Sequence, residues 1–107
     1  MPLYVTLVNW TDQGIKNYRD SVRRAEDYRG LVEKHGGQVR QLVWTLGEYD
    51  IVAVTEFPDD ETATAVALQT GALGNIRTTT MKAFDAEQMR AIIQRTVSTA
   101  AQQPYRP

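Results

Sequence analysis

The sequence contains no cysteine, one histidine and almost no excess of charge of either sign. The absence of cysteine excludes disulfides, a thiolate nucleophile and sulfur-ligated metal. The single histidine, His35, has no ligand partner nearby in the sequence, so we expect no metal site. Twelve Lys and Arg residues stand against 13 Asp and Glu residues, which provides no sustained positive field for nucleic acid or an anionic membrane.

Long hydrophobic runs are also missing. The first residues, "MPLYVTLVNW", lack the basic stretch and apolar run of a signal peptide, and no segment approaches the roughly 20 apolar residues of a membrane span. We therefore expect a cytoplasmic protein without membrane contact. The length of 107 residues and a hydrophobic content of 42% predict one domain over residues 1–101, followed by a flexible tail over residues 102–107.

The pattern that is present predicts four strands separated by helices. The strands are rich in β-branched and aromatic residues and span residues 3–10, 38–46, 49–57 and 76–84. Gly47-Glu48 lies between the second and third runs, and this pair predicts a two-residue hairpin turn.

Three helices are predicted from caps and apolar spacing. Thr11 or Asp12 should cap one long amphipathic helix that ends at the glycine pair 36–37. Asp59 or Asp60 should cap a second helix that ends near residue 71. A last helix should follow Asp85, with apolar positions at Ala86, Met89, Ile93, Val97 and Ala100.

The order β-α-β-β-α-β plus a terminal helix predicts a ferredoxin-like α+β fold with an antiparallel sheet in the order 4-1-3-2. Both internal helices should then lie on one face of the sheet. The other face remains apolar, with Leu3, Val5 and Leu7 alternating against Tyr4, Val8 and Trp10. The last helix could fold against that face, but we favour a homodimer or higher homo-oligomer formed through the sheet.

One end of this topology collects polar segments from the first helix, the hairpin and the fourth strand. The ligand-binding candidates at this end are Gln13, Lys16, Tyr49, Asp50 and Arg77. Lys16 or Arg77 could pair with Asp50, and Arg77 with its threonine neighbours could hold an anion. For each of these residues a structural role competes, since Tyr49 and Asp50 also suit the start of a strand. We interpret the large aromatics Tyr4, Trp10 and Trp44 as core or dimer contacts.

Three stretches in order, "TDQGIKNYRDSVRRA", "GGQVRQLVWTLGEYDIVAVTEFPDDE" and "GNIRTTTMKAF", resemble the signatures of GYD-domain proteins, named for a Gly-Tyr-Asp motif. Here the motif is Gly47-Glu48-Tyr49-Asp50. The resemblance covers nearly the whole chain. It implies a small ferredoxin-like domain similar to the dimeric α/β-barrel proteins, with no assigned biochemical role.

No catalytic triad can be assembled, since the serines are Ser21 and Ser98 alone and cysteine is absent. The first hypothesis is a homo-oligomeric module that binds a small anionic ligand and uses no cofactor. The alternative is a cofactor-independent oxygenase or isomerase of the dimeric α/β-barrel type, with an enclosed pocket between sheet and helices that contains a carboxylate or tyrosine of perturbed pKa. A third interpretation is a pure assembly unit. A tautomerase that uses the amine of Pro2 is the weakest alternative.

Overall fold

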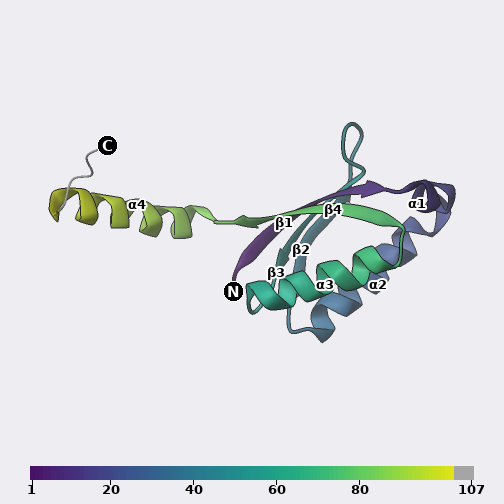
Figure 1. Cartoon of the computed structure of the whole chain (residues 1–107), viewed down its shortest axis with the longest axis horizontal. Helices are drawn as coiled ribbons and strands as arrows, with labels where there is room; N and C mark the ends of the chain where they lie inside the picture. The colour runs from purple at the N-terminus through teal and green to yellow at the C-terminus, as the bar shows by residue number, and fades with distance from the viewer. Residues whose placement is uncertain (103–107) are drawn as a thin grey trace.

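The structure is a computed structural model that describes residues 1–102, with side chains described as far as residue 97. It shows a four-stranded antiparallel sheet with two helices on one face and a third helix that extends beyond the sheet (Figure 1). Except for Gln102, which ends the last helix, the tail expected over residues 102–107 lies outside the described residues.

The four predicted strands are confirmed. They are β1 (Leu3–Trp10), β2 (Gln38–Trp44), β3 (Ile51–Glu56) and β4 (Ile76–Ala83). The sheet order is β2-β3-β1-β4, which is the predicted order counted from the opposite edge. Each neighbouring pair is antiparallel, and β1 lies between β3 and β4.

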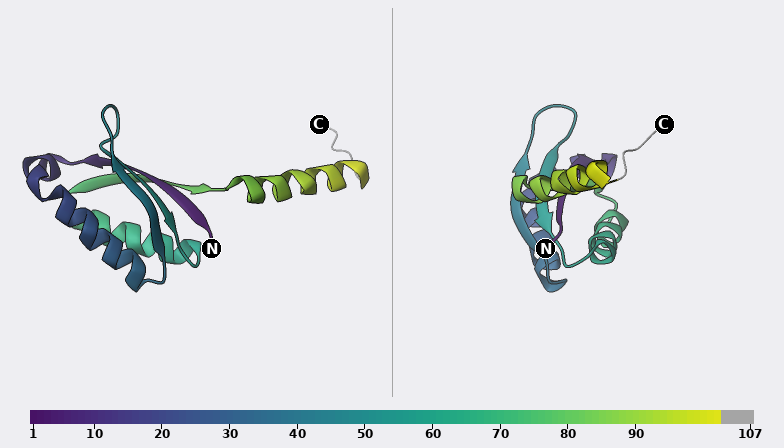
Figure 2. Two further views of the ribbon diagram at one scale, coloured as in Figure 1. Left: turned by 180° about the vertical axis from the view of Figure 1, so that it is seen from behind. Right: turned by 90° about the vertical axis from the view of Figure 1, so that its left-hand side faces the viewer.

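Helices α2 (Ser21–Lys34) and α3 (Asp60–Ala72) lie on the same side of the sheet (Figures 1 and 2). Tyr4 and Phe57 meet edge to face there, with ring centroids 5.7 Å apart. Val32 of α2 and Val66 of α3 complete this fully buried cluster. Every second residue of β1 from Tyr4 onward therefore faces the helices, as the alternation predicts.

The hydroxyl of Tyr4 leaves the apolar cluster and donates a hydrogen bond of 2.5 Å to Asp60 Oδ1 at the start of α3. Burial, and next this bond, raise the pKa of Tyr4 to about 12. The same bond lowers the pKa of Asp60. The contact fixes the first turn of α3 against β1. Asp59 caps that helix, since its Oδ1 accepts a bond of 2.8 Å from the backbone N–H of Thr62.

The prediction of one continuous first helix is wrong. The segment contains α1 (Asp12–Lys16), a 3₁₀ turn η1 (Tyr18–Asp20) and then α2. The backbone carbonyl of Asn75 lies where a Cβ of Gly14 would stand, 1.9 Å from the ideal position, so α1 packs directly on the loop before β4. The chain changes direction between α1 and α2 (Figure 1).

The predicted hairpin is present, but its two-residue turn is not. The loop between β2 and β3 covers residues 45–50, and Gly47 has a φ of +136° within it. Thr45 donates from its backbone N–H to Asp50 O (2.8 Å) and from its hydroxyl to Tyr49 O (2.6 Å). These bonds close the base of the loop, so residues 46–49 leave the ladder and project from the sheet.

Helix α4 (Ala86–Gln102) begins where the sequence predicts. Asp85 Oδ1 accepts from the backbone N–H of Gln88 (2.8 Å), and Gln88 Oε1 accepts from that of Asp85 (2.9 Å), which forms a capping box. The helix continues from the end of β4 and leaves the second face of the sheet uncovered (Figures 1 and 2). Of its predicted apolar face, the side chain of Ala100 lies outside the described part. Within residues 1–102, no helix combines the length and hydropathy that a membrane crossing needs.

Candidate functional site

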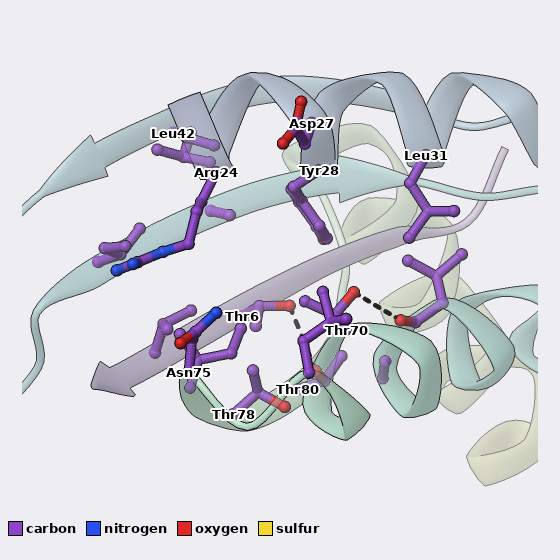
Figure 3. Close-up of a pocket in the computed structure, with 18 of the residues that line it drawn as sticks. Thr6, Arg24, Asp27, Tyr28, Leu31, Leu42, Thr70, Asn75, Thr78 and Thr80 are labelled. Carbon is purple, nitrogen blue, oxygen red and sulfur yellow. Dashed lines mark hydrogen bonds between the residues drawn. The ribbon is translucent and has the colours of Figure 1, made fainter. Parts of the chain in front are cut away.

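A cavity of about 270 Å³ lies between the sheet and the two helices α2 and α3 (Figure 3). Its walls come from both helices, from all four strands and from the loop before β4. Most of the lining is apolar, which is typical of small-molecule sites in proteins. The apolar residues of the wall include Val8, Leu31, Leu42, Ile51, Ala53, Phe57, Ala63, Val66, Ala67 and Ile76.

Tyr28 of α2 points into the cavity (Figure 3). Its side chain is half-buried, and this burial raises the pKa of the phenol to about 12. At neutral pH the group is therefore an uncharged hydroxyl. It can donate a hydrogen bond to a ligand, but it is a poor general base.

Arg24 supplies a positive charge at the end of the cavity near α1. Its Nη1 donates to Asn17 O at 2.9 Å, and its Nη2 donates to Gly14 O at 3.2 Å. Among the side chains that the structure describes, no carboxylate lies within salt-bridge distance of this guanidinium. Asp27 is exposed, and its carboxylate points away from the cavity (Figure 3). Arg24 therefore has no ion pair with any side chain that the structure describes.

Other hydrogen-bond donors line the same end. Trp10 also belongs to this end of the wall. Its indole Nε1 has no partner within the described residues, but the atom is buried and does not face the cavity space. The Oδ1 atom of Asn75 accepts a hydrogen bond from Gln13 Nε2 (2.9 Å). The amide nitrogen of Asn75 takes no part in this bond and can donate to a ligand. Thr78 adds a hydroxyl from β4. We find no group of three His, Cys, Asp or Glu side chains within residues 1–102 that could hold a metal ion.

The predicted site residues fall into different places. Asp50 is half-buried, and its Oδ2 accepts from the backbone N–H of Trp10 at 2.8 Å, while its own N–H donates to Val8 O at 2.9 Å. Asp50 thus ties the hairpin to the end of β1, directly beside a residue of the cavity wall. The expected ion pairs of Asp50 with Lys16 or Arg77 are not formed among the described side chains.

Gln13 lies on α1 and bridges to the loop before β4, because its Nε2 also donates to Leu73 O at 3.1 Å. Lys16 is exposed at the end of α1. Arg77 is exposed on β4 opposite Asn9, in the register that faces away from the helices. Tyr49 is half-buried in the hairpin loop. No hydrogen bond or salt bridge joins any two of the five candidate side chains in the described part.

The sequence suggested a pocket between sheet and helices only within the alternative enzyme hypothesis, and it did not identify the polar end of the cavity. The helical spacing left one inward position open between Tyr28 and Arg29, and Tyr28 lines the cavity. Arg24 lies in the charged stretch "RRAEDYRG", where nothing distinguishes it from its solvent-facing neighbours. Trp10 was interpreted as a core or dimer contact, and it lies in the cavity wall between the sheet and the helices.

The model of the GYD-domain family matches residues 4–93, which is most of the chain. The chain belongs to the GYD-domain family. In this GYD domain the motif aspartate, Asp50, accepts a hydrogen bond from the backbone N–H of Trp10. The motif therefore supports one end of the cavity. No curated protein matches the chain.

Among solved structures, the chain is similar to TTHA0845 from Thermus thermophilus. The sequences are 24% identical, the match covers 80% of this chain and 96% of that chain, and the TM-score is 0.51. The likeness supports the fold of the GYD domain. It assigns no ligand or reaction.

Proposed function

We propose that this GYD domain is a homo-oligomeric module that binds a small molecule in the cavity between its sheet and helices α2 and α3. The observation that carries the proposal is the cavity itself, because a domain of this size normally packs its interior without large voids. Its volume of about 270 Å³ is near the lower end of small-molecule sites, which measure roughly 300–1,000 Å³.

Filling the cavity tests this proposal. Ala67 of α3 lines the cavity, whereas Ala65 of the same helix is exposed. Ala67→Leu should abolish binding and Ala65→Leu should preserve it. Native mass spectrometry of the purified protein, followed by a thermal-shift screen of small molecules, measures both variants. Binding that is equally strong in the two variants, or absent from the parent protein, would refute the cavity as the site.

The uncovered face of the sheet and the apolar side of α4 support the homo-oligomer. On the sheet, Val43 is 40% exposed and Met81 44% exposed. On α4, Met89, Ile93 and Val97 are 46%, 51% and 55% exposed and follow one another at intervals of four residues. A helix without tertiary contacts is only marginally stable in water at this length. A second copy of the chain, seated face to face on the sheet, would cover these surfaces.

The dimer can be tested on α4. Ile93→Glu puts a charge on the apolar side, and Gln94→Glu puts the same charge on the neighbouring position. We expect sedimentation equilibrium to show a dimer for the parent and for Gln94→Glu, and a monomer for Ile93→Glu. A parent protein that is monomeric at high concentration would refute this part of the proposal.

Tyr28 favours one alternative, a cofactor-independent oxygenase or isomerase. That alternative requires a tyrosine of perturbed pKa in an enclosed pocket. Tyr28 supplies the tyrosine and lines the cavity, which is partly open to solvent. Because its pKa is raised, the phenol would act as a hydrogen-bond donor to developing negative charge rather than as a base. Tyr28→Phe should then abolish turnover of a bound compound while its affinity stays within a few-fold. Equal turnover by parent and variant would eliminate this role.

The anionic ligand expected at Gln13, Lys16, Tyr49, Asp50 and Arg77 stays a prediction. Lys16 and Arg77 are the cations of that set, and both are exposed. Lys16→Ala and Arg77→Ala should weaken the binding of an anion if the site exists. Unchanged binding and unchanged stability in both variants would eliminate it.

A further inference from the structure

We infer that the ligand of the cavity is a small monocarboxylic acid, with its carboxylate at the end formed by Arg24 and Asn75 and its apolar body beneath Tyr28. This inference rests on the proposed small-molecule function and specifies its chemical class. Its cation, Arg24, is not one of the five ligand-binding candidates predicted from the sequence, and of those five only Gln13 takes part, by orienting Asn75.

The hydrogen-bond donors at the Arg24 end of the cavity favour a carboxylate as the ligand group. The guanidinium of Arg24 and the amide nitrogen of Asn75 can only donate hydrogen bonds, and a carboxylate can only accept them. Both side chains line the cavity. A ligand carboxylate placed between them would also supply a negative charge to Arg24, which forms no salt bridge with a described side chain.

The side chains at this end are held in place by the motifs around them. Asn17 O and Gly14 O both accept from the guanidinium of Arg24, and the Cα of Gly14 abuts the carbonyl of Asn75. Gln13 fixes the orientation of the Asn75 amide. Donors that are already oriented lose little freedom when a ligand binds, so they bind more tightly than mobile ones.

The rest of the cavity selects the body of the ligand. Leu31 lies on the side of the cavity away from Arg24, and Tyr28 points into the space between them (Figure 3). Phe57 and Val66 also belong to the lining. None of the cavity-lining residues away from the Arg24 end carries a charge, apart from Asp27, whose carboxylate points outward. A short aliphatic chain or a single aromatic ring fits this lining, whereas a sugar or a nucleotide would leave its polar groups unpaired.

Isothermal titration calorimetry with matched probes tests the inference. The probes are octanoate and 3-phenylpropionate, with 1-octanol and 3-phenyl-1-propanol as neutral counterparts of the same carbon skeletons. We expect at least one acid to bind about tenfold or more tightly than its alcohol, because charge-assisted hydrogen bonds are the stronger ones. Asn75→Asp should remove this preference and leave the affinity for the alcohol unchanged, since the new side chain keeps the acceptor for Gln13 and adds a negative charge.

Arg24→Met is the second variant, with circular dichroism to verify its fold, because Arg24 also bonds to the backbone near α1. It should likewise remove the preference for the acid. If acid and alcohol bind equally in the parent, the carboxylate assignment is refuted while cavity binding stands. If neither class binds, the inference is refuted, and the proposed function is then decided separately by the ligand screen with Ala67→Leu and Ala65→Leu. If the preference persists in both variants, the carboxylate lies elsewhere and the inference is refuted.

Discussion

The absence of a side chain at Gly14 determines how α1 meets the loop before β4. An ideal Cβ at this position would lie 1.9 Å from the carbonyl oxygen of Asn75, which is backbone and cannot rotate away. Only glycine therefore allows α1 to contact the loop before β4. The same contact places Arg24 and Asn75 at one end of the cavity.

We predict that Gly14→Ala lowers the free energy of unfolding by roughly 1–3 kcal/mol or more, the usual cost of overpacking. Gly30 is the matched control, since it lies in α2 with no atom near its ideal Cβ. Gly30→Ala should raise stability by about 0.5–1 kcal/mol through helix propensity. Urea unfolding followed by circular dichroism measures both. Equal effects of the two substitutions would contradict the contact.

Tyr28 makes stability depend on alkaline pH. Its folded-state pKa is raised to about 12 from an ordinary value of 10.0, because burial disfavours the phenolate. The stability that this group contributes is fully present below pH 10 and is lost as the pH rises towards about 12. We predict that Tyr28→Phe, which does not titrate, loses less stability over this window than the parent.

Urea unfolding at a series of alkaline pH values measures this difference. Tyr18, whose side chain is exposed, provides the control variant Tyr18→Phe. The control should follow the parent. A Tyr28→Phe curve parallel to the parent across the window would show that Tyr28 is not buried in solution.

At the scale of elements, α1 is held by its cap as well as by its packing. The hydroxyl of Thr11 accepts from Gly14 N at 3.1 Å and donates to Gly74 O at 2.6 Å, so one side chain caps the helix and joins it to the loop after α3. A five-residue helix has too few internal bonds to persist without such support. The cap therefore determines whether this end of the cavity forms.

We predict that Thr11→Ala costs roughly 1–2 kcal/mol of unfolding free energy, at the upper part of the range for lost caps. Thr11→Ser keeps the hydroxyl and should retain most of that stability. Amide hydrogen exchange would show the loss of protection at Gly14 in Thr11→Ala. Protection equal to that of the parent would mean that packing alone holds α1.

At the scale of the whole molecule, two apolar surfaces have no cover within the described residues: the second face of the sheet and one side of α4 (Figure 2). The proposed homodimer would bury them, and association of this kind would stabilise the folded state by mass action. We predict that the melting temperature rises with protein concentration in differential scanning calorimetry. Met81→Glu, on the uncovered face, should lower the melting temperature and remove its dependence on concentration. A melting temperature independent of concentration in the parent would contradict the dimer.

The four strands, the last two helices and the order of these elements were predictable from the sequence. Alternation in β1, the threonine-rich run of β4, the choice of Asp59 or Asp60 as a cap and the helix start after Asp85 are local signals, and local propensity and capping act over a few residues. The strand order followed from chain connectivity and the handedness of crossovers. The membership in the GYD-domain family was likewise visible in the motifs.

Only the tertiary structure decided where α1 breaks from α2, how long the hairpin loop is, and which residues surround the cavity. The break depends on a backbone contact between Gly14 and Asn75, which are far apart in sequence. The role of Asp50 depends on the N–H of Trp10 in another strand, and the position of Arg24 depends on carbonyls that α1 turns towards it. Long-range contacts of this kind leave no periodic trace in a single sequence, so the motif could be found while its structural purpose could not.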